Sequence, residues 1–230
     1  DFRRGPEHGH IVVPKDRLRA GENTLDFSFE SDPAPFHRSQ DLIYTLFVPA
    51  RAHFAFPCFD QPDLKAQFNA TVHAPDGWVT VTNSVGQTAP ISTYLFAFAS
   101  GRFRIEESSG ASRPMRMYHM ETDSERVRRN RDAIFELHER ALDWLEEYTG
   151  IAYPFGKFEF LLIPGFQFSG MEHPGVIYYN AASLLLSGPK TESLLLNRAT
   201  LIAHETAHMW FGDLVTDRKS NTSELQSLAY

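Results

Sequence analysis

The chain has 230 residues, a formal charge of −7 and a single cysteine. Because domains commonly hold about 100–200 residues, this length corresponds to one or two domains. Hydrophobic residues make up 42% and aromatic residues 13% of the chain, which is typical of a globular protein and excludes collagen-like and low-complexity chains. The acidic balance leaves no basic surface to attract phosphates, so we expect no nucleic-acid partner. One cysteine, Cys58, cannot form an intramolecular disulfide, which excludes a disulfide-stapled scaffold.

From the pattern of the first residues we expect no signal peptide within this chain, and a signal removed before residue 1 stays open. Residues 1–10 are charged and contain Gly and Pro, with no apolar run typical of a signal peptide. The longest nearly apolar stretches, such as residues 94–99, are far shorter than the roughly 18 residues that a membrane-spanning helix needs. We therefore expect a soluble protein without a membrane span, and the compartment stays open between cytoplasmic and exported.

Short segments with strand character fill the first half of the chain. Residues 23–30 and 65–73 alternate apolar and polar side chains, as half-buried antiparallel strands do. Four further β-rich runs are separated by Pro, Gly, Asn and Asp: residues 42–48, 78–83, 93–103 and 115–120. The pattern predicts an antiparallel β-sandwich or saddle-shaped domain over residues 1–120.

The pattern becomes helical near residue 121. Thr122 and Glu125 fit a capping box, apolar residues recur at helical spacing over 123–148, and Gly150 provides a C-terminal stop. Strands are expected at 157–163 and 175–179, and a second helix at 191–211 is expected to end at Gly212. Residues 121–230 are therefore predicted to form an α+β domain, with a domain boundary near Met120.

The second helix carries the motif His204-Glu205-Thr206-Ala207-His208. Residues four apart lie on the same face of a helix, so both imidazoles can reach one zinc ion at about 2.0–2.1 Å. Glu205 lies about 100° around the helix from His204, where a general base can take a proton from a metal-activated water. The sequence leaves one alternative open, an amphipathic core helix with two partly exposed histidines and a solvated Glu205.

Four motifs together resemble one enzyme family. Residues 201–216 look like the zinc helix of the aminopeptidase N-like metallopeptidases, which belong to the gluzincin clan with thermolysin. The segment Gly170-Met171-Glu172-His173-Pro174-Gly175 is similar to the Gly-x-Met-Glu-Asn exopeptidase motif of that family. Residues 56–62 and 92–98 match motifs of its N-terminal β domain. The motifs occur in the family's order, and the resemblance covers about residues 10–216.

The resemblance implies a fold, a cofactor and a set of roles. The fold would be α+β, with an antiparallel β domain followed by the N-terminal part of a thermolysin-like catalytic domain. His204 and His208 would bind one zinc ion and Glu205 would be the general base. Glu172 would accept the free α-ammonium of a peptide substrate, with Gly170 and Met171 beside it. The implied activity is hydrolysis of the N-terminal peptide bond through metal-activated water.

The sequence departs from the family pattern at two places. His173 stands where the family has Asn, which leaves its role at the amine site open. The family's third zinc ligand, a Glu on the next helix, falls at Ser227, and the nearest downstream candidate is Glu224. The resemblance also implies that the β domain lacks its first strands and that the catalytic domain is incomplete.

Two other functions stay open. A non-catalytic peptide-binding or scaffold module could keep the fold without the third zinc ligand. A hydrolase of the leukotriene-hydrolase branch would carry the same motifs.

Overall fold

The computed structural model describes residues 11–108 and 113–216, and the chain divides into two units at residues 30 and 31. In the first unit, a short 3₁₀ helix, η1 (Lys15–Arg17), is followed by a turn in which the Asn23 side chain bonds the Arg19 backbone. The predicted strand at 23–30 is wrong: this segment is irregular, and Leu25, Phe27 and Phe29 are about half exposed. An alternation of apolar and polar residues forms a strand only when a partner strand pairs with it. No strand among the described residues pairs with this segment.

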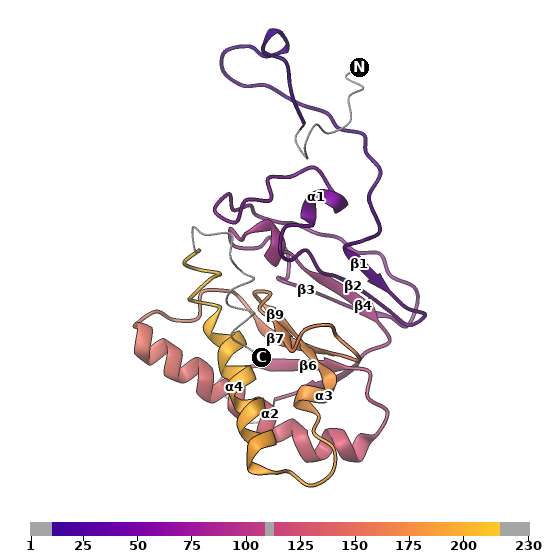
Figure 1. The fold of residues 1–230 in the computed structure, drawn as a ribbon, viewed down its shortest axis with the longest axis vertical. Coiled ribbons are helices and arrows are strands. Elements are labelled where there is room, and N and C mark those ends of the chain that lie inside the picture. Colours follow the sequence, from indigo (N-terminus) through magenta and orange to yellow (C-terminus); the bar gives the residue numbers. More distant parts are fainter. Residues whose placement is uncertain (1–10, 109–112, 217–230) are drawn as a thin grey trace. The chain divides into compact units, whose positions relative to one another are not determined.

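Among the described residues, a four-stranded antiparallel sheet lies in the first part of the second unit. Its order is β1-β2-β4-β3, with β1 (Phe36–Arg38), β2 (Leu42–Thr45), β4 (Phe98–Gly101) and β3 (Val79–Thr82) (Figure 1). The predicted strand at 78–83 is confirmed, and that at 42–48 is confirmed for residues 42–45. Only the second part of 93–103 is a strand, because 93–95 form a 3₁₀ helix, η2. The prediction for 65–73 is wrong except for one bridge between Ala66 and Ile91.

A second sheet of five strands is mixed and runs β5-β6-β7-β9-β8 in the described part of the chain. Its strands are β5 (Arg104–Glu107), β6 (Met115–His119), β7 (Phe158–Ile163), β9 (Val176–Asn180) and β8 (Gly170–Met171). β6, β7 and β9 are parallel, and β5 and β8 are antiparallel to their neighbours. Pairing of β6 with β7 crosses residue 120, and the domain boundary there stays a prediction.

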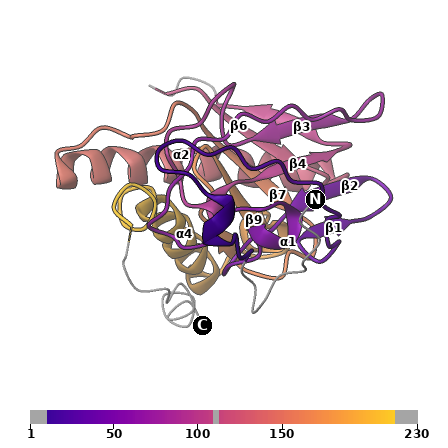
Figure 2. The same ribbon diagram turned by 90° about the horizontal axis from the view of Figure 1, so that it is seen from above.

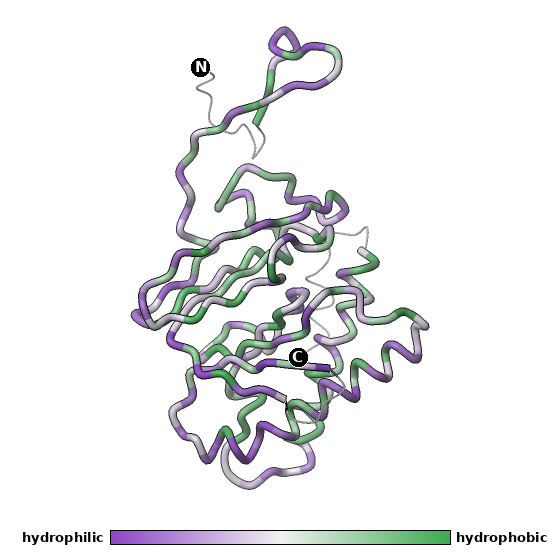
Figure 3. Tube along the Cα trace, turned by 180° about the vertical axis from the view of Figure 1, so that it is seen from behind, coloured by the Kyte–Doolittle hydropathy of each residue, from purple (hydrophilic) through white to green (hydrophobic). Residues whose placement is uncertain are grey.

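The long helix α2 (Ser124–Thr149) buries one face and exposes the other. Its buried apolar residues are Val127, Ile134, Phe135, Leu142 and Leu145. The helix changes repeatedly between hydrophilic and hydrophobic colours along its length (Figure 3), as expected for an amphipathic helix. The cap is Asp123, whose carboxylate accepts from the backbone N–H groups of Glu125 and Arg126, so the predicted Thr122 capping box is wrong. The predicted stop at Gly150 is confirmed, with φ 67°.

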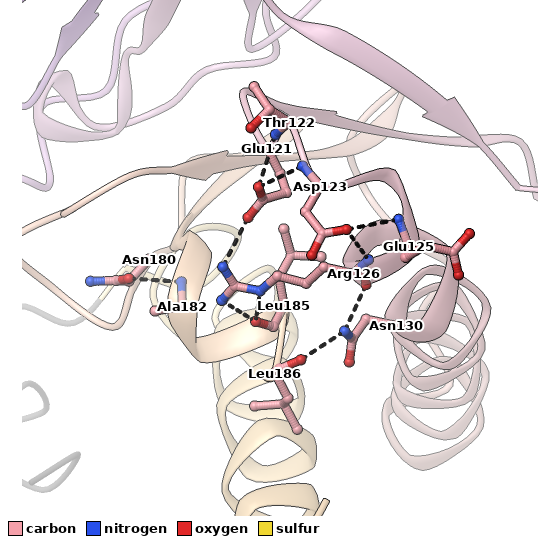
Figure 4. A network of polar contacts seen from close by, with 10 residues as sticks. All are labelled: Glu121, Thr122, Asp123, Glu125, Arg126, Asn130, Asn180, Ala182, Leu185 and Leu186. Atoms are coloured by element: carbon pink, nitrogen blue, oxygen red, sulfur yellow. Dashed lines mark hydrogen bonds and ion pairs between the residues drawn. The ribbon is translucent and has the colours of Figure 1, made fainter. Parts of the chain in front are cut away.

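A polar network fixes the start of α2 to the segment that leads into the next long helix (Figure 4). Arg126 pairs with Glu121 at 2.8 Å and donates from Nε to the Leu185 carbonyl at 2.8 Å. Asn130 donates to the Leu186 carbonyl at 3.1 Å. This segment follows the short helix α3 (Ala181–Leu184), which Asn180 caps. The network therefore ties the segment that precedes α4 to α2.

Helix α4 (Glu192–Ala207) packs beside α2, as two views of the ribbon show (Figures 1 and 2). Thr191 caps it by accepting from the Leu194 N–H. The helix ends at Ala207, before the predicted residue 211, because the following backbone changes its hydrogen bonding. Three successive backbone hydrogen bonds there join residues five apart. The N–H groups of Asp213, Leu214 and Val215 donate to the carbonyls of residues 208, 209 and 210, in that order.

Two further small elements complete the described fold, the short helix α1 (Ala52–Ala55) and η2 (Thr93–Leu95). None of the helices within residues 11–108 and 113–216 is both long and apolar enough to cross a membrane.

Candidate functional site

Two imidazoles converge at the end of α4. The Nε2 atoms of His204 and His208 lie 3.2 Å apart, and the ring planes are nearly perpendicular at 88°. Two ligands at about 2.0–2.1 Å from one tetrahedral ion stand roughly 3.3–3.4 Å apart, so the pair fits a single zinc ion. Burial, with His208 acting in the same direction, lowers the pKa of His204. A neutral imidazole at neutral pH is the form that binds metal.

Two buried carboxylates face the same point. Ligand atoms of Glu172, Glu205 and His208 all lie within 4.8 Å of one another. Glu172 is 6% and Glu205 is 5% exposed. Burial, and after it the charge of Glu172, raises the pKa of Glu205 well above its ordinary value. Two buried acids without a cation are unfavourable, so this arrangement fits a bound cation, a protonated amine, or both.

Gly170 provides the room that Glu205 occupies. A Cβ at this position would stand 2.3 Å from Glu205 Oε1 and 2.4 Å from its Cδ. Gly170 and Met171 form β8, which pairs with Tyr179 and Tyr178 of β9. Met171 is completely buried, and its side chain belongs to the core. The sheet edge and α4 therefore meet at the Gly170–Glu205 contact.

The turn that follows α4 orients His208. Its Nδ1 lies 3.2 Å from the Phe211 carbonyl, which accepts a bond from the Nδ1–H tautomer and leaves Nε2 free as a ligand. Gly212 has φ 134°, and a Cβ there would stand 3.2 Å from His208 Nδ1. On the other side of the turn, the Trp210 indole donates to the Ile151 carbonyl at 3.0 Å. The Phe211 carbonyl thus orients the ring, and the Trp210 bond ties the turn to the Ile151 backbone.

The loop after Glu172 is anchored by Asn83 at the end of β3. Asn83 Nδ2 donates to the Pro174 carbonyl at 2.8 Å and to the Leu95 carbonyl at 2.9 Å. Gly175 has φ 78°, and a Cβ there would stand 1.9 Å from the Asn83 carbonyl oxygen. The Asn83 side chain therefore links the 92–98 and 170–175 motifs, which are far apart in the sequence.

His173 lies in the core beneath this loop. It is completely buried, and its ring centroid is 4.6 Å from that of Tyr178. Burial lowers the pKa of His173 to about 3, so the ring is neutral near pH 7. The side chain is therefore a packed neutral group in this loop.

Sequence reasoning overlooked two groups near the site. Asp213 is completely buried, and neither of its carboxylate oxygens has a hydrogen-bond partner in the described part of the chain. Lys65, from the first half of the chain, donates to the backbone carbonyls of Asp213 and Leu214. Asp213 lies in the segment that resembles the zinc helix, but no spacing rule connects Lys65 with it.

A cavity of about 520 Å³ runs along α4 beside His204. Its lining includes leucines and small polar residues, and the α4 positions in it are Leu194, Asn197, Arg198, Thr200, Leu201 and His204. Because it reaches one of the paired imidazoles, the cavity offers room for a chain bound at the site. The predicted third-ligand candidate Glu224, and Ser227, lie outside the described residues.

Comparison with known proteins identifies both parts of this fold. Residues 10–95 match the Peptidase M1 N-terminal domain, and residues 134–223 match the Peptidase family M1 domain. The two sheets and the helices are thus an M1 N-terminal domain followed by the start of the catalytic domain, which confirms the α+β prediction. The chain belongs to the M1 peptidase family, as the four motifs predicted.

Several curated relatives match over most of the chain. Aminopeptidase N of Streptomyces lividans is 36% identical over 91% of the chain and 27% of the relative. Puromycin-sensitive aminopeptidase of Caenorhabditis elegans is 30% identical over 84% of the chain and 23% of the relative. The thyrotropin-releasing hormone-degrading ectoenzyme of Rattus norvegicus is 31% identical over 85% of the chain and 20% of the relative. The chain spans about a quarter of the length of these relatives.

Proposed function

We propose that the chain carries part of the active site of a zinc-dependent aminopeptidase, which hydrolyses the N-terminal peptide bond of peptides. The observation that carries this proposal is the convergence of two imidazole Nε2 atoms, 3.2 Å apart, with the Glu172 and Glu205 carboxylates. Membership of the M1 family, with relatives named as aminopeptidases, supports the reaction class.

His204 and His208 would hold one zinc ion, and Glu205 would act as the general base. When bound, zinc lowers the pKa of a water toward ~7 and polarises the carbonyl under attack. Glu205 takes the proton from the attacking water at its carboxylate and delivers it to the leaving amine. Its position supports this role, because Gly170 leaves room for the Glu205 carboxylate beside the histidine pair.

Glu172 would anchor the free α-ammonium of the substrate. Its carboxylate lies within 4.8 Å of a His208 ring nitrogen, so an ammonium bound to it stands beside the proposed metal position. Only the first peptide bond can then reach the metal, since one residue spans about 3.3–3.6 Å. The remainder of the peptide would run into the cavity beside His204.

Metal analysis combined with an aminoacyl-anilide assay tests this proposal on the protein at its full natural length. We expect one zinc per chain, and Glu205→Gln should keep the zinc and lose most of the turnover. Glu136→Gln, an exposed carboxylate on α2, is the matched control and should retain both. Zinc-loaded protein whose turnover survives Glu205→Gln would refute the mechanism.

The amine anchor has a separate test. Glu172→Ala should weaken hydrolysis of substrates with a free amino terminus far more than that of N-acetylated ones, because only the former carry the ammonium. Equal losses on both substrates would refute the anchor. Zinc and peptide binding without turnover in the unmodified protein would instead favour the non-catalytic peptide-binding module.

A further inference from the structure

One lysine of the β domain reaches the turn that follows the histidine helix. Lys65 Nζ donates to the Asp213 carbonyl at 2.6 Å and to the Leu214 carbonyl at 3.0 Å, across 148 and 149 positions of the chain. A backbone carbonyl oxygen only accepts hydrogen bonds, and a lysine ammonium carries three donors. An ammonium group is therefore well suited to bind both of them at once.

The backbone that presents Lys65 is itself held firmly. Its neighbour Ala66 exchanges two backbone hydrogen bonds with Ile91, at 2.9 and 3.0 Å. Three residues earlier, the Pro62 carbonyl accepts from the Ser92 hydroxyl at 2.5 Å. Ile91 and Ser92 are completely buried. The backbone at Lys65 is therefore held by hydrogen bonds on both sides, as expected of a residue that sets the position of another segment.

The turn that Lys65 holds connects directly to His208. The Asp213 N–H donates to the His208 carbonyl at 3.0 Å, and the neighbouring bonds from Leu214 to Met209 and from Val215 to Trp210 are 3.2 and 3.1 Å. Within the same turn, the Phe211 carbonyl lies 3.2 Å from His208 Nδ1. Displacement of the Asp213 and Leu214 carbonyls would therefore displace the group that fixes the ring of His208.

We propose that Lys65 is a positioning residue that holds the turn after α4, and through it the orientation of the His208 imidazole toward the metal. The proposal rests on the zinc site of the proposed function. Groups that orient metal ligands typically contribute 10–100-fold to metal affinity. Lys65 acts through one further backbone connection, so we expect an effect near the lower end of that range.

Lys65→Met removes the donor and keeps much of the side-chain length. In the protein at its full natural length, we expect the zinc dissociation constant, measured by competition with a chromophoric chelator, to rise about tenfold. Hydrogen exchange of amides in 208–215, measured by mass spectrometry on zinc-free protein, should accelerate. Lys65→Arg, which retains donors for both carbonyls, should partly restore both quantities.

Lys157→Met is the matched control. The Lys157 side chain is 19% exposed, and its ammonium pairs with Glu159 at 2.6 Å instead of with the turn after α4. The Lys157→Met variant should be less stable than the wild type, with unchanged zinc affinity and unchanged hydrogen exchange of the amides in 208–215. Unchanged affinity and exchange in Lys65→Met, or equal losses in Lys157→Met, would overturn the proposal.

The two measurements separate this inference from the proposed function. Absence of zinc from the unmodified protein would refute the zinc aminopeptidase, while exchange of the zinc-free turn would still decide whether Lys65 holds it. If Lys65→Met does not fold, Lys65→Gln provides a neutral donor of intermediate length for the same two measurements. Wild-type affinity and exchange in Lys65→Gln would also overturn the need for a cation at this position.

Discussion

Replacement of Gly170 by alanine should disable the site through a single contact. The new Cβ would stand 2.3, 2.4 and 2.6 Å from Oε1, Cδ and Cγ of Glu205, whereas ordinary contacts begin near 3.4 Å. Glu205 is 5% exposed and has little free space, so its carboxylate must move by about 1 Å. A displacement of that size can reduce the rate about 100-fold.

Steady-state kinetics with an aminoacyl anilide measures this effect. We expect kcat of Gly170→Ala to fall by about two orders of magnitude, while zinc content stays unchanged because His204 and His208 are not touched. Gly156→Ala is the matched control, since a Cβ at Gly156 meets nothing within 4 Å. Wild-type kcat in Gly170→Ala would refute the importance of the close packing between Gly170 and Glu205.

A double-mutant cycle on stability isolates the same contact. Overpacking of this kind costs about 1–3 kcal/mol of unfolding free energy. In a Glu205→Ala background all three crowded atoms are absent, so Gly170→Ala should then cost less than about 0.5 kcal/mol. Equal costs in the two backgrounds, measured by urea denaturation, would show that the strain lies elsewhere.

Three further predictions concern the turn, the cap and a buried histidine. Gly212→Ala places a Cβ 3.2 Å from His208 Nδ1 at φ 134°, so it should weaken zinc binding and lower stability by about 1–3 kcal/mol; unaltered chelator competition would contradict this. Asp123→Ala removes the cap of α2 and should lower the unfolding free energy by about 1 kcal/mol, with zinc affinity as the unchanged comparison. Burial lowers the pKa of His138 to about 4. As the pH falls from about 6.5 to 4.5, His138 therefore takes up a proton in the unfolded chain but not in the folded one. The unfolding free energy should decrease by about 2 kcal/mol over this range. The stability difference between wild type and His138→Gln should therefore narrow as the pH falls, and a constant difference would contradict the assignment.

The sequence predicted α2 closely, because the spacing of apolar residues and the capping residues that define a helix lie within the helix and at its ends. The apolar spacing and Gly150 located the helix to within a residue at its C-terminal end. The N-terminal cap was misassigned because Thr122 and Asp123 are both good caps, and the competition is decided by which oxygen reaches the N–H groups of Glu125 and Arg126. Such a choice depends on the direction of the incoming backbone, which sequence patterns do not contain.

Strand predictions failed where strand formation depended on the presence of a pairing strand. Residues 23–30 alternate as well as any strand in the chain, yet no described strand pairs with them. In contrast, β7 and β9 are nearly continuous apolar runs, and their burial on both faces follows from parallel pairing in the middle of the sheet.

The helical part of the site was predictable, whereas its surroundings depended on tertiary contacts. A spacing of four residues predicts that His204 and His208 share a face, and their Nε2 atoms do converge. The approach of Glu172, the packing of Gly170 on Glu205 and the reach of Lys65 depend on how a sheet edge and a distant loop meet α4. No local sequence pattern specifies these tertiary contacts.

The pairing of β6 with β7 has a consequence for exchanging parts between relatives. A hybrid protein joined at residue 120 would set β5 and β6 from one parent beside β7 from the other, so side chains from two parents would have to fit within one buried sheet. A junction between β4 and β5, near residue 102, would keep all five strands from a single parent. The smallest transferable unit of this architecture therefore begins about twenty residues before the change from strands to helices along the chain.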